Sequence, residues 1–473
     1  MTTDAVLALN RFGVGARPGE TARIAGDPRG WLVAQLSRPS AALIDDPALM
    51  SSDAAARSLA QARRAKREPA AQGTAQGAVE GAVEGAVAGT AMPVAASEPP
   101  AGPGRVRRAI DRAEVEARLA HGTATEAGFV ERLALFFANH FAVSADKGPV
   151  RVLAGAFERE AIRPYVLGRF ADMLRAVQRH PAMLVYLDNQ RSVGPGSPAG
   201  ARRGLGLNEN LARETLELHT LGVAGGYGQA DVTALARVLT GRGWVPPRAD
   251  RPDAGRFLFS ANRHEPGAAT ILGLTYRPGG LEQGDAVLDA LARHPATARH
   301  LARKLATHFI ADDPPEGAVA RLEAAYREGD GDLAVVAAAL VATPEAWDPA
   351  PRKFKAPYEF VLSAARLAPG LGGRDGRTLR ALAAFGQRTF APPSPRGWPD
   401  AAAEWLAPHA FKARIDWAAE ACERAPPACN PVALAEDAFG PLLSAPTRRE
   451  IARAETGAQG LALLLMSPEF QRR

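Results

Sequence analysis

The chain has 473 residues, 47% of them hydrophobic and 6% aromatic, which is enough to bury a core in one large domain or in two to three ordinary ones. Its formal net charge of +6 is small for this length, and arginines are scattered among acidic residues along most expected helices. Composition and charge therefore predict no nucleic-acid partner.

The sequence also lacks the signals of a membrane or secreted protein. No stretch reaches the roughly 18 consecutive apolar residues that a membrane span needs. The N-terminus, MTTDAVLALNRFGVGARPGE, has no basic region followed by an apolar run. We expect a soluble protein, cytoplasmic by default, with export left open.

The first two expected units are a helical segment over residues 1–69 and an insertion over residues 70–104. The insertion contains the repeat GAVEGAVEGAVAGT and the proline-rich run AMPVAASEPPAGPG. Such a composition cannot bury enough apolar surface to offset the entropy lost on ordering, so we expect disorder. Short basic runs flank it: Arg63, Arg64, Lys66 and Arg67 before, and Arg105, Arg107 and Arg108 after. Residues 105–473 form the main helical body and are expected to share one domain with residues 1–69.

Helical periodicity dominates the body. Between Thr125 and Phe141, apolar residues and His140 recur at the spacing of one wide helical face, so His140 should be buried. Similar spacing, with Gly and Pro separators, predicts helices over Gly148–Phe170, Asp172–His180, Asn208–Leu221, Gln229–Thr240, Gly284–His294, Pro295–Ile310, Gly317–Arg327, Leu333–Val341, Lys355–Leu367 and Ala401–Arg424. The one β-like stretch lies near residues 256–276, where RFLFS and ATILGLTY flank NRHEPG. Without βαβ alternation or a phosphate-binding glycine loop, we predict an all-α fold with one small β-hairpin.

The segment from Asn208 to Gly226, NENLARETLELHTLGVAGG, has polar groups all around the expected helix. At about 100° per residue, Asn210, Glu214 and Glu217 share one face, with Arg213 at its edge. A surface helix normally has one apolar stripe, so polar groups on every side indicate solvent or a hydrogen-bonded polar interior.

Two interpretations of this segment stay open. In the structural one, Asn208 caps the helix, Arg213 pairs with Glu217 four residues on, and His219 caps free carbonyl groups. In the functional one, the polar groups line a site. His219 points roughly opposite Asn210, and Glu217 and His219 are two residues apart, so they do not form a helical metal pair.

Other candidate site residues stand at helix ends and turns, and each also has a purely structural interpretation. Asn139 and His140 end the Thr125–Phe141 helix, and a lone buried histidine is more often a core residue than a catalyst. His264 lies in a His-acid dipeptide at the expected hairpin tip, where it could transfer protons if it faced a cleft. The remaining candidates are Asp188, before the loop SVGPGSPAGARRG, and Arg242, Trp244 and Trp398 in turns that suit ligand or partner anchors.

Cys422 and Cys429 could pair or remain two thiols. No further ligands for a zinc site are evident near them, so we predict no metal site, and the residues identify no cofactor. Nucleophilic catalysis lacks a Gly-x-Ser-x-Gly elbow.

A series of motifs resembles the domain of unknown function 1800 family, an uncharacterised bacterial family. They are RFGVGARPGE, FFANHFAVS, FEREAIRPYVLGRF, HPAMLVYLDNQ, the Asn208 segment, RHEPG, ARHLARKLATHF, KFKAPYEF and PPSPRGWPD. The family pattern around Asn139 and His140 reads Trp-His-Asn-His, whereas this chain has Phe137 and Ala138 in the first two places. That difference argues against a strict metal site. The resemblance also implies a partner, because members are often encoded beside proteins of unknown-function family 1501, which resemble sulfatases and phosphatases.

Two functions follow as hypotheses. The first is a hydrolase with a polar pocket between the helix ending at Phe141 and the Asn208 helix. Glu217 or Glu214 would be the general base. Arg213 and His140 would orient it or bind an anionic group of the substrate, and Asn139 and Asn210 would donate hydrogen bonds. The second is a non-enzymatic binding or assembly partner of a sulfatase- or phosphatase-like protein. Exposed Trp244 and Trp398 would favour the partner, and a closed pocket lined by the carboxylates of Glu214 and Glu217 would favour the enzyme.

Overall fold

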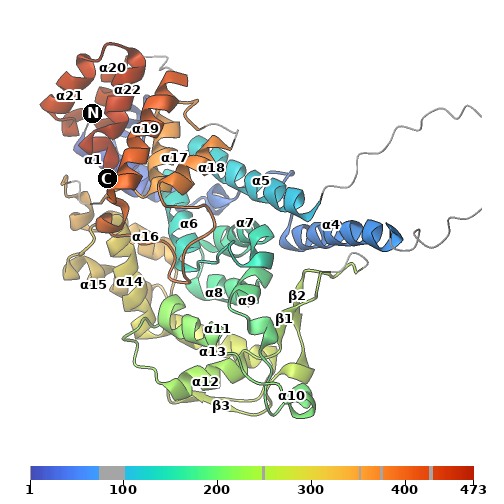
Figure 1. Cartoon of the computed structure of the whole chain (residues 1–473). Helices are drawn as coiled ribbons and strands as arrows, with labels where there is room; N and C mark the ends of the chain where they lie inside the picture. Colours follow the sequence, from blue (N-terminus) through green and yellow to red (C-terminus); the bar gives the residue numbers. More distant parts are fainter. Residues whose placement is uncertain (1, 74–101, 248–250, 351–352, 373–375, 425–429) are drawn as a thin grey trace, which may run out of the picture.

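The computed structural model describes residues 2–73, 102–247, 251–350, 353–372, 376–424 and 430–473. In these ranges the chain folds mainly into α-helices, with two short antiparallel sheets at one end (Figure 1). The predicted all-α fold is confirmed. None of the helices described is both long enough and apolar enough to cross a membrane.

Of the five N-terminal helices described, the second and third pack against the first, and the fourth and fifth project away from the body. They are α1 (Thr3–Leu7), α2 (Glu20–Ile24), α3 (Pro28–Gln35), α4 (Ser52–Gly73) and α5 (Pro103–Ala124). Helices α4 and α5 pack side by side and reach outward (Figure 1). Of the predicted insertion over residues 70–104, the two ends are helical because α4 continues to Gly73 and α5 begins at Pro103. The rest of that prediction, residues 74–101, lies outside the described residues.

The middle of the chain supplies seven short helices. They are α6 (Gly128–His140), α7 (Ala154–Phe157), α8 (Phe170–Arg179), α9 (Pro181–Tyr186), α10 (Pro198–Arg203), α11 (Asn210–Glu214) and α12 (Gln229–Val238). The single helix predicted over Gly148–Phe170 is instead broken into α7 and short 3-10 and π turns, with Pro164 inside the last of them.

The remaining helices complete the body and form a C-terminal bundle. Both chain ends lie at this bundle (Figure 1). They are α13 (Leu281–Arg293), α14 (Pro295–Phe309), α15 (Glu316–Glu328), α16 (Leu333–Ala342), α17 (Pro357–Leu367), α18 (Arg377–Ala384), α19 (Pro408–Arg424), α20 (Pro431–Phe439), α21 (Ala445–Ala452), α22 (Gly457–Met466) and α23 (Pro468–Gln471). Short 3-10 turns connect several elements: η2 (Pro39–Ala42), η4 (Gly148–Val152), η6 (Arg163–Tyr165), η7 (Asn189–Arg191), η9 (Ala261–Arg263), η10 (Pro344–Trp347), η11 (Ala402–Trp405) and η12 (Gly440–Leu442).

In the part of the chain that the structure describes, three segments wind as π-helix: η1 (Ala8–Phe12), η5 (Glu158–Ile162) and η8 (Thr215–His219). The third one corrects the prediction of a regular α-helix over Asn208–Leu221. Because a π turn is wider than an α turn, it changes which side chains share a face. Such turns often occur at functional sites.

The β-structure also differs from the predicted hairpin. Strand β1 (Arg242–Trp244) pairs with β2 (Phe257–Phe259), and β3 (Ala269–Ile271) pairs with β4 (Leu274–Tyr276). RFLFS therefore does not pair with ATILGLTY. The latter is a hairpin by itself, because Leu272 and Gly273 both take the positive φ that a tight two-residue turn requires.

Aromatic side chains from distant parts of the chain meet in the core. The Phe12 ring lies 5.7 Å from Phe129 on α6 and 4.8 Å from Trp347, and Phe129 lies 5.8 Å from Phe309 on α14. One cluster of buried apolar residues runs from Ala5 to Phe470. That residues 1–69 and 105–473 form one domain stays a prediction, which this shared packing supports.

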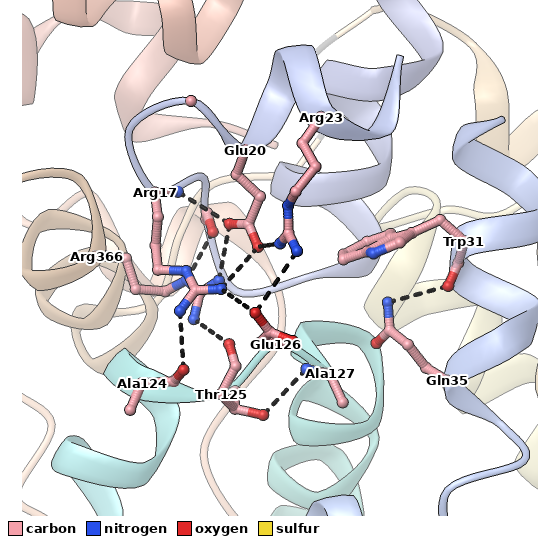
Figure 2. Close-up of polar contacts among 12 residues, drawn as sticks. Arg17, Glu20, Arg23, Trp31, Gln35, Ala124, Thr125, Glu126, Ala127 and Arg366 are labelled. Carbon is pink, nitrogen blue, oxygen red and sulfur yellow. Dashed lines mark hydrogen bonds and ion pairs between the residues drawn. The ribbon is translucent and has the colours of Figure 1, made fainter. Parts of the chain in front are cut away.

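A buried carboxylate fixes the N-terminal segment to the body (Figure 2). Glu20 is 3% exposed, and its carboxylate accepts hydrogen bonds from Arg17 at 3.2 Å, Arg23 at 3.0 Å and Arg366 at 3.1 Å. Arg366 on α17 also donates to the backbone carbonyl of Gly15 at 2.7 Å. The acidic residue of RFGVGARPGE therefore holds three guanidinium groups together.

Candidate functional site

Helix α14 carries three basic side chains on one face. Its start is fixed by His294, whose Nδ1 accepts a hydrogen bond from the Ala296 backbone N–H at 3.1 Å. His300, Lys304 and His308 follow at intervals of four residues, so they lie one above another. This face meets α6, since the His308 ring lies 5.4 Å from that of Phe136.

Lys304 and His140 form a buried pair where the two helices meet. Lys304 Nζ lies 3.0 Å from His140 Nδ1, and His140 Nε2 lies 3.1 Å from the backbone oxygen of His219. Because a carbonyl can only accept, His140 donates from Nε2 and accepts from Lys304 at Nδ1. The predicted burial of His140, which is 2% exposed, is confirmed.

Burial sets the charge of this cluster. Burial and repulsion from Lys304 lower the pKa of His219 to about 3 and that of His300 to about 4. The same causes hold the pKa of His140 well below its ordinary value. Burial lowers the pKa of Lys304 to about 8. At neutral pH the three histidines are therefore uncharged.

One turn further along α14, His308 is paired with a carboxylate. His308 Nδ1 lies 2.8 Å from Oδ1 of Asp400, in the loop between α18 and α19. Burial raises the pKa of Asp400, but the attraction of His308 and their hydrogen bond outweigh this effect and lower it to about 2. Burial lowers the pKa of His308 more than Asp400 raises it. The pair is thus an ionised carboxylate beside a neutral imidazole whose Nδ1 carries the proton.

His308 and Asp400 line a cavity between α6, α7, the start of α17 and the loop before α19. About 110 Å³ of this cavity is accessible to water-sized groups, which is room for a few waters or a small polar substrate. Glu158 and Glu359 also line it, and their carboxylates are paired with Arg163 at 2.7 Å and with Arg473 at 3.0 Å.

The cavity wall contains buried polar atoms without partners. Among the described residues, His308 Nε2, Thr389 Oγ1 and Tyr358 Oη are buried and make no hydrogen bond. All three residues line this cavity. Since buried polar groups are nearly always hydrogen-bonded, three such atoms on residues that line one cavity indicate a place that water or a ligand occupies.

The loop that carries Asp400 is anchored by Asn139. The Asn139 Nδ2 donates to the Trp398 carbonyl at 2.8 Å, and the Trp398 N–H donates to Asn139 Oδ1 at 2.7 Å. Gly397, with φ of 83°, fits against Asn139 because a Cβ there would come within 2.4 Å of its backbone oxygen. Asn139 and Trp398 both line the cavity. Their substrate-binding role stays a prediction, while their contact positions Asp400.

The predicted acid-base residues of the Asn208 segment lie outside the cavity lining. Glu217 contacts Arg396 at 3.4 Å rather than Arg213, and the latter pairs with Glu209 at 3.2 Å. The π turn after Glu214 accounts for this, because it changes the angular spacing on which the expected Arg213–Glu217 pair depended. Burial and the nearby Glu217 raise the pKa of Glu214.

Two other residues of that segment have structural contacts. Asn210 is exposed, and its backbone N–H donates to Asn208 Oδ1 at 3.0 Å, but the N-cap of α11 is Glu209 and not the predicted Asn208. His219 is fully buried, and its Nδ1 lies 3.5 Å from the side-chain amide of Gln178. The structure therefore brings His219 to His140 but keeps Asn210 apart from both.

The remaining predicted site residues lie in other parts of the body. Arg242 is buried and pairs with Asp285 at 3.1 Å, and Trp244 is half-buried against the core. His264 is 8% exposed, with Nδ1 3.1 Å from the Thr240 carbonyl oxygen. Asp188 pairs with Lys147 at 2.6 Å. None of these four lines the cavity that holds His308.

A comparison with protein families matches nearly the whole chain to a single family. The model of the family described as a protein of unknown function (DUF1800) matches residues 7–472. The chain belongs to the DUF1800 family. Comparison with curated proteins and with solved structures found no match. The DUF1800 description names no activity, so the function has to be argued from the site.

The sequence analysis missed His308, Lys304 and His300 as site residues, although all three lie in the DUF1800-like motif ARHLARKLATHF. The signal that could have found them is their four-residue spacing, which places three basic side chains on one face of an otherwise amphipathic helix. Asp400 had no such signal, because only the folded chain brings it to His308, 92 residues away.

Proposed function

We propose that this DUF1800 protein is a hydrolase in which His308 is the general base and Asp400 orients it. The observation that carries the proposal is the cavity wall itself. It joins a carboxylate-bound imidazole to two hydroxyl groups, those of Tyr358 and Thr389, that have no partner among the described residues. A neutral imidazole held at Nδ1 by a carboxylate has its Nε2 lone pair available for a proton.

The chemistry uses water as the nucleophile. Nε2 of His308 takes a proton from a water molecule in the cavity, and the water oxygen forms a bond to the electrophilic atom of the substrate. The bond to the leaving group then breaks, and protonated His308 returns the proton to the leaving group. Asp400 stabilises the imidazolium meanwhile, and the hydroxyls of Tyr358 and Thr389 would donate hydrogen bonds to the negative charge that develops on the substrate.

Glu214 and Glu217, the bases that the sequence suggests, are less well placed. Glu214 has a raised pKa, as a general base often does, but neither it nor Glu217 lines the cavity. Exposed Trp244 and Trp398 would favour the rival hypothesis, an assembly partner for a sulfatase- or phosphatase-like protein. Trp244 and Trp398 are both half-buried, and the cavity is lined by Asp400 in place of the expected Glu214 and Glu217.

Water labelled with oxygen-18 tests hydrolysis even when the substrate is unidentified. The protein is incubated in this water with a deproteinised cell extract, and mass spectrometry identifies small molecules that gain the label. We expect labelled products with the unaltered protein and with the exposed-histidine control His409→Gln, and none with His308→Gln. Labelled products that persist with His308→Gln, or that are absent with the unaltered protein, would contradict the proposal.

A further inference from the structure

The arm formed by α4 and α5 concentrates the positive charge of the molecule. Helices α4 and α5 together contain ten arginines and lysines and five acidic residues, which is a net charge of +5. Within them, residues 63–67 and 105–112 contain eight arginines and lysines and one acidic residue, Asp111, which is a net charge of +7. The whole chain has a net charge of +6, so everything else together is close to neutral, at −1. In the sequence these two runs are separated by about 40 residues, and the fold places them on neighbouring helices (Figure 1).

The two helices bury apolar side chains and leave most of these cations exposed. Leu59 and Ala62 on α4 and Ile110 on α5 are buried. Arg63, Lys66, Arg67, Arg105 and Arg108 are exposed, and none of these five has a carboxylate within ion-pair distance among the described residues. Elsewhere most exposed arginines pair with an acid, as Arg448 does with Glu436 at 2.6 Å.

The arm lacks the groups that other polyanion-binding surfaces use. Residues 51–124 contain no Phe, Trp or Tyr, so there is no ring on which an unpaired base could stack. In the described parts of α4 and α5 no large apolar side chain is exposed that could anchor the arm in a bilayer. What remains is a set of cations, seven of the eight being arginines, whose guanidinium groups suit phosphate oxygens.

The distribution of these cations around the helix favours a grooved partner over a flat one. At about 100° per residue, the basic side chains at positions 63, 64, 66 and 67 span an arc of roughly 160° on α4. A planar lipid surface contacts one side of a rod, whereas the groove of a nucleic-acid duplex presents phosphates on both sides of it.

We propose that the α4–α5 arm binds the phosphate backbone of double-stranded nucleic acid without sequence preference. This interaction is separate from the cavity at His308 and does not depend on it. The low overall charge of the chain predicts no nucleic-acid partner. That overall value does not reveal the arm, since nearly all of the net positive charge lies there and the remainder of the chain is nearly neutral. Binding through several phosphates releases counterions, so the affinity should fall steeply with salt.

Fluorescence anisotropy of a labelled 30-base-pair DNA duplex tests the proposal on the full-length protein. The arm variant carries Arg63→Ala, Lys66→Ala, Arg105→Ala and Arg108→Ala, and alanine preserves helix propensity. The control variant carries Lys412→Ala, Arg424→Ala, Arg448→Ala and Arg453→Ala, which remove the same charge from the exposed C-terminal region. Circular dichroism verifies that both variants are folded.

At about 50 mM salt we expect the arm variant to bind the duplex at least ~10-fold more weakly than the unaltered protein, and the control within about 2-fold of it. Raising salt to about 200 mM should weaken the unaltered protein more than the arm variant. Equal weakening of both variants, or no binding at the lower salt, would overturn the proposal. A second measurement compares binding to vesicles containing phosphatidylserine. If the unaltered protein bound these vesicles more tightly than the duplex and the arm variant lost that vesicle binding, the arm would be a membrane contact and the proposal would be overturned.

Discussion

The carboxylate of Glu217 lies at the surface, with 26% of its side chain exposed, 3.4 Å from an Arg396 that is 69% exposed. Exposed ion pairs of this kind contribute about 0–1 kcal/mol, because water and salt screen them. We therefore expect Glu217→Gln to lower the free energy of unfolding by less than about 1 kcal/mol in a urea titration. Hydrolysis should also persist, since Glu217 does not line the cavity. Loss of hydrolysis with unchanged stability would restore Glu217 as the base.

The buried histidines predict how stability depends on pH. The pKa of His300 is about 4 in the folded protein, against about 6.5 in an unfolded chain. Below about pH 6.5 the unfolded chain binds the proton and the folded protein does not, so stability is complete above that pH and is lost as pH falls toward 4.

His300→Gln isolates this contribution, because a glutamine amide can still donate to the Leu218 carbonyl that His300 Nε2 contacts at 3.1 Å. Between pH 7.5 and pH 5 we expect the unaltered protein to lose about 2 kcal/mol more stability than the variant. Urea titrations at both pH values measure the difference. Identical losses would show that at pH 5 His300 binds a proton as readily in the folded protein as in the unfolded chain.

Among the elements, the loop between α18 and α19 is predicted to depend on Gly397. In Gly397→Ala the new Cβ would collide with Asn139 and displace Trp398 and Asp400. Gly386→Ala is the matched control, since Gly386 has a φ of 90° and nothing within 4 Å of an added Cβ. Both variants should lose about 1 kcal/mol through the left-handed backbone. Only Gly397→Ala should also lose hydrolysis, and equal activity in both variants would contradict the anchoring role.

The sequence predicts elements better than it predicts their contacts. Apolar spacing locates α6 and α14 because their buried faces repeat at the helical period. It does not show the π turn at Thr215–His219, whose wider winding depends on tertiary packing. For the same reason the sequence marks Asn139 as unusual but does not reveal its contact with Trp398, 259 residues away. His308 and Asp400 also lie on two distant elements, so the sequence around either residue does not predict that the other is its partner.

For the whole molecule, the buried pair of Glu131 and Arg163 connects the N-terminal segment with the main body. The Glu131 carboxylate accepts hydrogen bonds from Arg163 at 2.7 and 2.9 Å, and Arg163 also donates to the Ala42 carbonyl at 2.8 Å. Arg163 also pairs with the buried Glu158 at 2.7 Å, so Glu131→Gln leaves Arg163 with one carboxylate partner in place of two. We expect the change to cost about 2 kcal/mol, the contribution of a hydrogen bond to a charged group.

Differential scanning calorimetry of Glu131→Gln also tests whether residues 1–69 and 105–473 form one domain. If they unfold together, the variant should show a single transition at a lower temperature. A separate early transition, with the main one unchanged, would mean that the N-terminal segment unfolds independently.

The central claim is that His308 and Asp400 act as one catalytic unit in the cavity, and a double-mutant cycle measures this directly. Rates of oxygen-18 incorporation are compared for the unaltered protein, His308→Gln, Asp400→Asn and the double variant. Residues that act together are not additive, so the double variant should be no slower than His308→Gln alone. Independent, multiplying losses, or a rate for His308→Gln equal to that of His409→Gln, would contradict the account.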